Sequence, residues 1–205
     1  LLENDKTQPA IRYYALRDIL GRDETDKEVK AAKAAIMTSG PVPVILASQQ
    51  PEGYWWKPGP DYNGTMYPVV FMAQLGADGT DPRVRAGCEY LLSRYIDSNG
   101  GLAWNLTRSG CVPCGAGIMG AALIDLGWLD DQRLQTAMEW LARTITGEGV
   151  GDPSDSDTNK RYDKSGNSGP LFACSGIPCA WGAIKAMVAL SKVPPAQRTR
   201  NMQAA

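Results

Sequence analysis

The sequence contains no histidine. This absence excludes a Ser-His-Asp triad, a Cys-His dyad and any histidine metal ligand, so proton transfer would have to use Asp, Glu, Tyr, Lys, Cys or bound water. An excess of charge of one sign is also lacking, because 21 Lys and Arg residues are balanced by 22 Asp and Glu residues, for a net charge of -1. A nearly neutral chain has no electrostatic attraction to nucleic acid or acidic lipid, and we expect neither as a partner.

Long hydrophobic runs are missing as well. No apolar stretch approaches the roughly 18 residues needed to cross a bilayer, so we expect no membrane span. Five cysteines, an odd number, occur in a chain of 205 residues that has no signal-like leader. This combination favours a reducing compartment over a secreted disulfide scaffold and predicts a cytoplasmic protein. The length suits a single domain, residues 1–205, with one buried core.

Helical periodicity runs through most of the chain. A proline suited to a first helical turn, apolar residues at helical spacing and a glycine stop predict a helix over residues 9–20. Similar signals predict further helices from 26, over 43–49, over 66–75, from 82, over 113–126, from 130 or 131, over 178–193 and over 196–205. The polar, glycine-rich segment 147–169 is expected to be either a functional lid or poorly ordered.

A Leu-Gly pair ends one helix and is followed by a second helix at three places along the chain: Leu20–Gly21, Leu75–Gly76 and Leu126–Gly127. Leu190 begins a degenerate fourth copy. Repeats with a period of about 50 residues are typical of stacked helical hairpins, each of which buries one face on its neighbours. We therefore predict an all-α fold, an array of about four helical hairpins.

A second repeated element lies in the loops between the hairpins. These loops end in QQPEGYW (49–55), NGGLAW (99–104) and TGEG (146–149). The first copy has the form Q-x-x-x-G-x-W, and it resembles the QW repeat of squalene and triterpene cyclases. The resemblance implies an α/α toroid, a fold shared with protein prenyltransferases and lanthipeptide cyclases, in which inner helices surround a central cavity and outer helices lie behind them.

A full toroid of that family has more hairpins than are counted here. We therefore expect a partial toroid, a piece of a longer protein with hairpins missing, or one half of a homo-oligomer. Within the repeated loop, Gly53 would permit a tight turn before an inner helix. Trp55 would stack over the preceding helix end, and Gln49 would bond to unpaired backbone groups. On this interpretation the motif is structural.

Four cysteines form two pairs, each just ahead of a predicted inner helix: Cys111 and Cys114, then Cys174 and Cys179. In a toroid the pairs would meet at one rim, where four thiolates could close a tetrahedral zinc site. Buried reduced thiols, disulfides and a redox pair are the alternatives. A four-cysteine site is closed, which favours structural over catalytic zinc. The zinc of the toroid enzymes, by contrast, has three protein ligands that include histidine. Cys88, on a helix face, is expected in the core.

Asp155-Ser-Asp157-Thr158 is similar to the aspartate-rich acid motif of class II terpene cyclases. The similarity implies that Asp157 is a catalytic acid that protonates an alkene or epoxide. Thr158, however, stands where the family motif has a further aspartate. A solvated loop without chemistry is the alternative.

Aromatic residues cluster near the predicted starts of inner helices. Five of them are candidates for a ligand pocket: Tyr14, Trp55, Tyr67, Trp104 and Trp181. In a toroid they could face one cavity suited to an apolar ligand or a carbocation, or they could simply pack helix ends and loops. Two functions therefore stay open. One is a terpene-cyclase-like or prenyltransferase-like protein that binds an apolar ligand, with an isoprenoid as the candidate; the other is a zinc-stapled helical-repeat scaffold or binding module.

Overall fold

The computed structural model shows a mostly helical protein, as predicted. It describes residues 1–56, 64–97, 100–103, 112–146, 173–174, 177–178 and 180–205. The described helices are α1 (Pro9–Tyr14), its π-helical continuation η1 (Ala15–Ile19), α2 (Lys27–Ile36), α3 (Pro41–Ala47), α4 (Met66–Gln74), α5 (Pro82–Arg94), α6 (Pro113–Asp125), α7 (Gln132–Thr146), α9 (Ala180–Ser191), the 3-10 turn η2 (Pro195–Gln197) and α10 (Arg200–Ala204). Two strands of two residues each, β1 (Ala173–Cys174) and β2 (Ile177–Pro178), pair antiparallel. The helices begin and end close to where the sequence predicts them.

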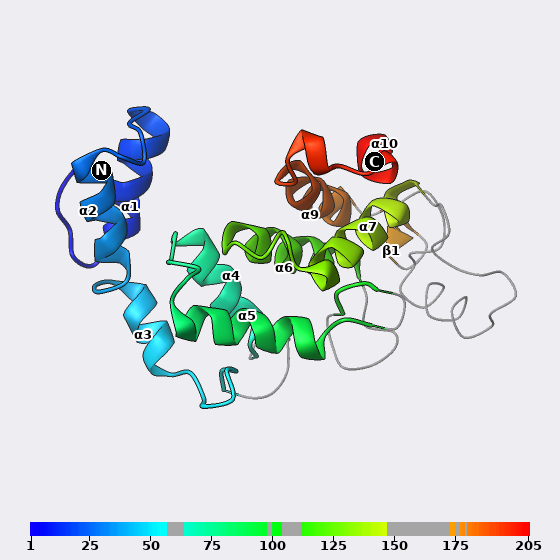
Figure 1. Ribbon diagram of the computed structural model, residues 1–205, viewed down its shortest axis with the longest axis horizontal. Helices are drawn as coiled ribbons and strands as arrows, with labels where there is room; N and C mark the ends of the chain where they lie inside the picture. The colour runs from blue at the N-terminus through cyan, green and yellow to red at the C-terminus, as the bar shows by residue number, and fades with distance from the viewer. Residues whose placement is uncertain (57–63, 98–99, 104–111, 147–172, 175–176, 179) are drawn as a thin grey trace, which may run out of the picture.

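Helix α6 packs on both α4 and α9, and α6 and α9 run in the same direction. A Cβ atom at Gly117 of α6 would lie 2.5 Å from the carbonyl carbon of Lys185 in α9. At the C-terminal ends of the two helices, the ammonium of Lys192 donates a hydrogen bond of 2.7 Å to the carboxylate of Asp125. Gly79, just beyond α4, lies against the end of α6. Short turns connect α4 to α5 and α6 to α7. Figure 1 shows α1–α3 at one end of this array and α9 and α10 towards the other.

The repeated Leu-Gly pair is a repeated helix C-cap. Glycines with positive φ stand at each copy: Gly21 (62°), Gly76 (75°) and Gly127 (82°). The backbone N–H of the residue after the glycine donates a hydrogen bond to a carbonyl oxygen in the last turn of the helix, as in a Schellman motif. Ala77 donates to Met72 at 2.9 Å, and Trp128 donates to Leu123 at 3.0 Å. In the first copy the bond returns to Leu16, one residue further back, because η1 is a π-helical turn.

Helices α5 and α7 begin with the same side-chain cap. Asp81 accepts a hydrogen bond from the N–H of Arg83 at 2.8 Å, and Asp131 accepts one from the N–H of Arg133 at 2.9 Å. Each arginine side chain also bonds to its aspartate, which lowers the pKa of both carboxyl groups. Arg133 binds Glu89 as well, with two contacts of 2.8 Å, and so joins α7 to α5.

The two described inter-hairpin loops are also equivalent to each other. Isolated antiparallel bridges close them: Gln49–Trp55 and Ile96–Leu102. At the turn of each stands a glycine with positive φ: Gly53 (93°) and Gly100 (87°). Leu102 therefore occupies the position equivalent to Trp55. The alignment of the loop sequences predicts Trp104 at that position. Trp104 itself lies outside the described residues.

Gln49 and Trp55 hold the first loop against its neighbours, as expected for a structural motif. The side-chain amide of Gln49 donates to the carbonyl oxygen of Arg83, at 2.9 Å, in the first turn of α5. The indole N–H of Trp55 donates to the carbonyl oxygen of Ile45 in α3 at 2.7 Å. Its ring is fully buried against Gly87 of α5, where an added Cβ atom would lie only 2.7 Å from the indole.

The two repeats differ in side-chain size at two pairs of equivalent positions, one in the loop and one on the following helix. Leu102 and Ala137, both fully buried, stand at the positions equivalent to Trp55 and Gly87. The second repeat therefore has a side chain smaller than tryptophan in the loop and a residue larger than glycine on the helix. This exchange is the behaviour expected of a close-packed core, in which total volume matters more than the identity of each side chain.

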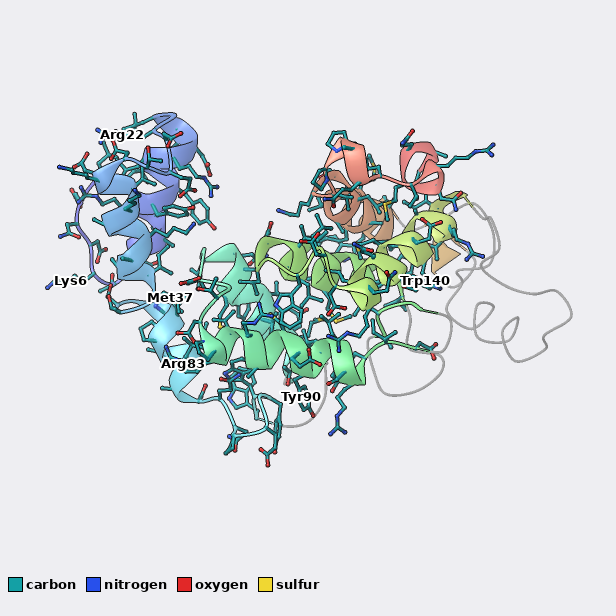
Figure 2. The ribbon with its side chains drawn as sticks, viewed as in Figure 1. Lys6, Arg22, Met37, Arg83, Tyr90 and Trp140 are labelled. Carbon is teal, nitrogen blue, oxygen red and sulfur yellow. The ribbon has the colours of Figure 1, made fainter. Side chains whose placement is uncertain are left out.

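A second exchange lies beside the first. In the first loop the rings of Tyr54 and Tyr90 pack with centroids 5.4 Å apart. In the second loop Gly101 replaces the first ring, and the ring of Trp140 packs so close that a Cβ atom at Gly101 would be 2.7 Å away. Figure 2 shows Tyr90 on α5 and Trp140 on α7.

One stretch passes a composition test for a membrane span. Residues Lys27–Ala47 are long and apolar enough by length and composition alone. Gly40, with a φ of 70°, divides the stretch into α2 and α3, and α2 has Val29 and Ile36 buried on one side. The described part of the chain therefore gives only weak support for a membrane span.

We predict that the Trp55–Gly87 pair can be replaced by the Leu–Ala pair of the next repeat. Gly87→Ala alone should cost about 1–3 kcal/mol through overpacking, and Trp55→Leu alone roughly 2–4 kcal/mol through the cavity left behind. The double variant should cost clearly less than both costs together, with a coupling of about 1 kcal/mol or more. Urea unfolding followed by circular dichroism measures this cycle. Additive costs would contradict the proposed exchange.

Candidate functional site

Side chains on one side of each of α4, α6 and α9 reach solvent. The residues are Tyr67, Phe71 and Gln74 of α4, Cys114, Ile118, Ala121 and Asp125 of α6, and Trp181, Lys185 and Val188 of α9. Residues three and four apart lie on one side of a helix. A cavity of about 190 Å³ between the helices is lined by Gln74, Ile118 and Val188, so the three sets share one face. We call these ten residues the inner face.

Most of the inner face is apolar. Phe71, Trp181 and Val188 are exposed large side chains, and Trp181 leaves 63% of its surface accessible. The rings of Tyr67 and Phe71 pack with centroids 5.7 Å apart. Soluble domains rarely expose several large apolar side chains together unless the surface binds something. The inner face is therefore the best candidate site in the described part of the chain.

The inner face becomes charged where the helices end. A second cavity, of about 310 Å³, shares Gln74, Asp125 and Lys192 with the first. Its opposite wall belongs to the first hairpin and consists of Tyr13, Tyr14, Arg17, Glu24 and Lys33. The guanidinium of Arg17 lies over the Tyr14 ring, 4.9 Å from its centroid. Burial raises the pKa of the Tyr14 phenol, although Arg17 acts in the opposite direction.

Sequence reasoning missed the charged residues of this second cavity. Arg17, Asp125 and Lys192 come from three different hairpins, and only the fold brings them together. One signal was available in the sequence. Asp125 directly precedes the Leu126–Gly127 cap, so its place at a helix end could have been inferred from the repeat.

The structure brings together only part of the predicted aromatic pocket. Tyr67 and Trp181 lie on the inner face, and Tyr14 lines the adjoining charged cavity. Trp55 does not join them, because it is fully buried between α3 and α5 and leaves no surface for a ligand. Trp104 lies outside the described residues.

The described parts of the two cysteine pairs lie near the starts of adjacent helices. Cys114 is in the first turn of α6, and Cys174 pairs through its backbone with Ile177 shortly before α9. Because α6 and α9 run parallel in close contact, their N-terminal ends lie on the same side of the array. Cys111 and Cys179 fall outside the described residues. Among the residues that are described, no three potential metal ligands come together.

Two further predicted residues have simple outcomes. Asp157, the candidate catalytic acid, falls outside the described residues. Cys88 lies in the core, as expected, and is fully buried on α5. Burial raises the pKa of its thiol to about 12, so the unreactive protonated form dominates at neutral pH.

Comparisons with protein families, curated proteins and solved structures found no match to this chain. The assignment of a function therefore depends on the residues and geometry described above.

We predict that Gly117 cannot be replaced by alanine without forcing α6 and α9 apart. The added Cβ atom would lie 2.5–2.6 Å from backbone atoms of Lys185. We expect a loss of about 2–3 kcal/mol in the free energy of unfolding from overpacking, against a helix-propensity gain of only about 1 kcal/mol.

Gly127→Ala is the matched control for this substitution. Nothing lies within 4 Å of the added Cβ atom, so only the left-handed backbone is penalised, by roughly 1–2 kcal/mol. Urea midpoints of the two variants provide the measurement. Net stabilisation by Gly117→Ala, the result that helix propensity alone would give, would mean that the two helices are not in close contact.

Proposed function

We propose that this chain forms part of an α/α toroid and binds an apolar ligand of the isoprenoid class on its inner face. The observation that supports this is the exposed face that α4, α6 and α9 share, with α6 and α9 parallel and with α5 and α7 following α4 and α6 after short turns. In an α/α toroid, as the QW resemblance implies, such a face lines the central cavity.

The chemistry of the face fits a long apolar molecule with a polar end. Phe71, Trp181 and Val188 offer exposed aromatic and aliphatic surface, and aromatic faces stabilise alkenes and developing positive charge. At the end of the helices, the cations Arg17 and Lys192 line the adjoining cavity together with the carboxylates of Glu24 and Asp125. A polar head group bound there would therefore meet both donors and acceptors. Catalysis, if present, would depend on an acid such as Asp157 beside this face.

A zinc-stapled scaffold or binding module is the second candidate function. It is favoured by the shared side on which α6 and α9 begin, with Cys114 in the first turn of one and Cys174 shortly before the other. Four thiolates there would bind zinc as a closed structural site in a reducing, cytoplasmic environment. The two candidates differ in whether the inner face is occupied by a ligand.

Binding of a ligand should raise the melting temperature by mass action. Farnesyl diphosphate at 100 times its dissociation constant would stabilise the protein by about 2.7 kcal/mol. Farnesol and inorganic diphosphate, tested separately, report whether the apolar chain or the anionic head provides the binding energy.

Trp181→Ala should abolish most of this stabilisation, because it removes the most exposed ring of the inner face. Trp56→Ala is the matched control, since Trp56 is exposed to a similar extent, 62% against 63%, and is not among the inner-face residues. No stabilisation by either isoprenoid would favour the scaffold. If the ligand stabilises Trp181→Ala as much as the wild-type protein, it does not bind at the inner face.

The zinc proposal has an independent test. Protein purified without chelator should contain about one zinc ion per chain, held by the four cysteines. Cys111→Ser and Cys114→Ser should each release the metal and lower the melting temperature. Cys88→Ala removes a thiol that is buried in the core and should leave the zinc content unchanged. Elemental analysis that finds no zinc in the wild-type protein would rule out the site.

A further inference from the structure

The charged cavity of about 310 Å³ continues the inner face at the place where α4, α6 and α9 end. It shares four lining residues with the apolar cavity between these helices: Ala73, Gln74, Asp125 and Lys192. A molecule that lies along the inner face can therefore reach into the charged cavity with one end. The polar groups of this cavity determine which head group fits that end.

The cations of the charged cavity already face carboxylates. Three pairs are present: Arg17 with Asp18, Lys33 with Glu24, and Lys192 with Asp125. The N–O distances in these pairs are 2.5, 3.7 and 2.7 Å, in the same order. A diphosphate would have to displace these carboxylates, and it would meet Glu24 and Asp125 as like charges in the lining. The charge of the cavity therefore disfavours an anionic head group.

Two neutral polar groups of the same cavity are free to bind a ligand. In the part of the chain that the structure describes, neither the phenol of Tyr14 nor the side-chain amide of Gln74 has a hydrogen-bond partner. The Tyr14 hydroxyl lies beside the end of α4, because a Cβ atom at Gly76 would be 3.1 Å from its oxygen. Gln74 is the last residue of α4. Burial raises the pKa of the Tyr14 phenol, which therefore stays protonated and can donate at neutral pH.

We propose that the ligand of the inner face is an isoprenoid alcohol and not a diphosphate, with its hydroxyl group bound between Tyr14 and Gln74. This assignment rests on the proposed binding of an isoprenoid to the inner face. A hydroxyl group accepts from a phenol and donates to an amide oxygen, so it can satisfy both side chains at once. The three ion pairs of the cavity then stay intact.

Thermal-shift titrations with farnesol and farnesyl diphosphate test the choice of head group. In the wild-type protein, the dissociation constant of farnesol should be lower than that of farnesyl diphosphate by about tenfold or more. Asp125→Asn removes the carboxylate that faces Lys192, so the diphosphate should bind about threefold tighter or more and farnesol should be unaffected. Asp130→Asn is the matched control, because it changes the net charge equally at an exposed residue that lines neither cavity.

Tyr14→Phe tests the hydrogen bond itself. It should raise the dissociation constant of farnesol by about threefold to tenfold. The same variant should bind farnesene, a hydrocarbon of the same chain length without the hydroxyl group, as tightly as the wild-type protein does. Tyr90→Phe is the matched control, since Tyr90 is a half-buried tyrosine on α5 that lines neither cavity. Circular dichroism checks that each variant remains folded.

The possible failures are distinguishable. Wild-type protein that binds farnesyl diphosphate as tightly as farnesol, or tighter, would overturn the alcohol assignment and leave the isoprenoid site in place. Equal losses of farnesol and farnesene binding in Tyr14→Phe would also overturn the assignment, because the phenol would then not contact the hydroxyl group. If none of the three compounds stabilises the wild-type protein, both the assignment and the proposed function are wrong.

Discussion

The close contact between α6 and α9 is the constraint on which the rest of the structure depends. Gly117 leaves a bare position on α6 that the backbone at Lys185 of α9 fills, and Gly120 leaves another that Met138 of α7 fills, with Ala189 of α9 beside it. Such a close approach increases the dispersion contacts between the helices. Parallel packing then determines three further features. The two N-terminal ends share one side, the exposed stripes share one face, and Asp125 meets Lys192.

Local signals in the sequence were sufficient to predict the helices and their ends. Gly76 and Gly127 indicate a left-handed helix cap, because that backbone conformation is strained for other residues. Asp81 indicates the start of a helix, because its carboxylate can accept a hydrogen bond from an unpaired backbone N–H. These effects act within a few residues. The repeat of hairpins was therefore readable, and so was the structural role of Gln49 and Trp55 in their loop.

The candidate site could be predicted only in part, because its residues are joined by packing between distant segments. Tyr67 and Trp181, two of the predicted pocket residues, lie on the inner face, but nothing local distinguishes them from Trp55, which is a core residue because Gly87 leaves room for its ring. Likewise, the pairing of Asp125 with Lys192 depends on the direction in which α9 packs. Periodicity gives the face of a helix but not the neighbour that covers it.

Helix α9 shows how the two sides of one short helix have different surroundings. An α-helix turns 100° per residue, so residues three and four apart lie on the same side. Ala186 and Ala189 are buried on the side that packs on α6. Ile184 lies within one turn of both Trp181 and Val188, and all three side chains are exposed. The exposed apolar surface of α9 is therefore continuous with the inner face, because the rotation of the helix leaves no polar stripe between them.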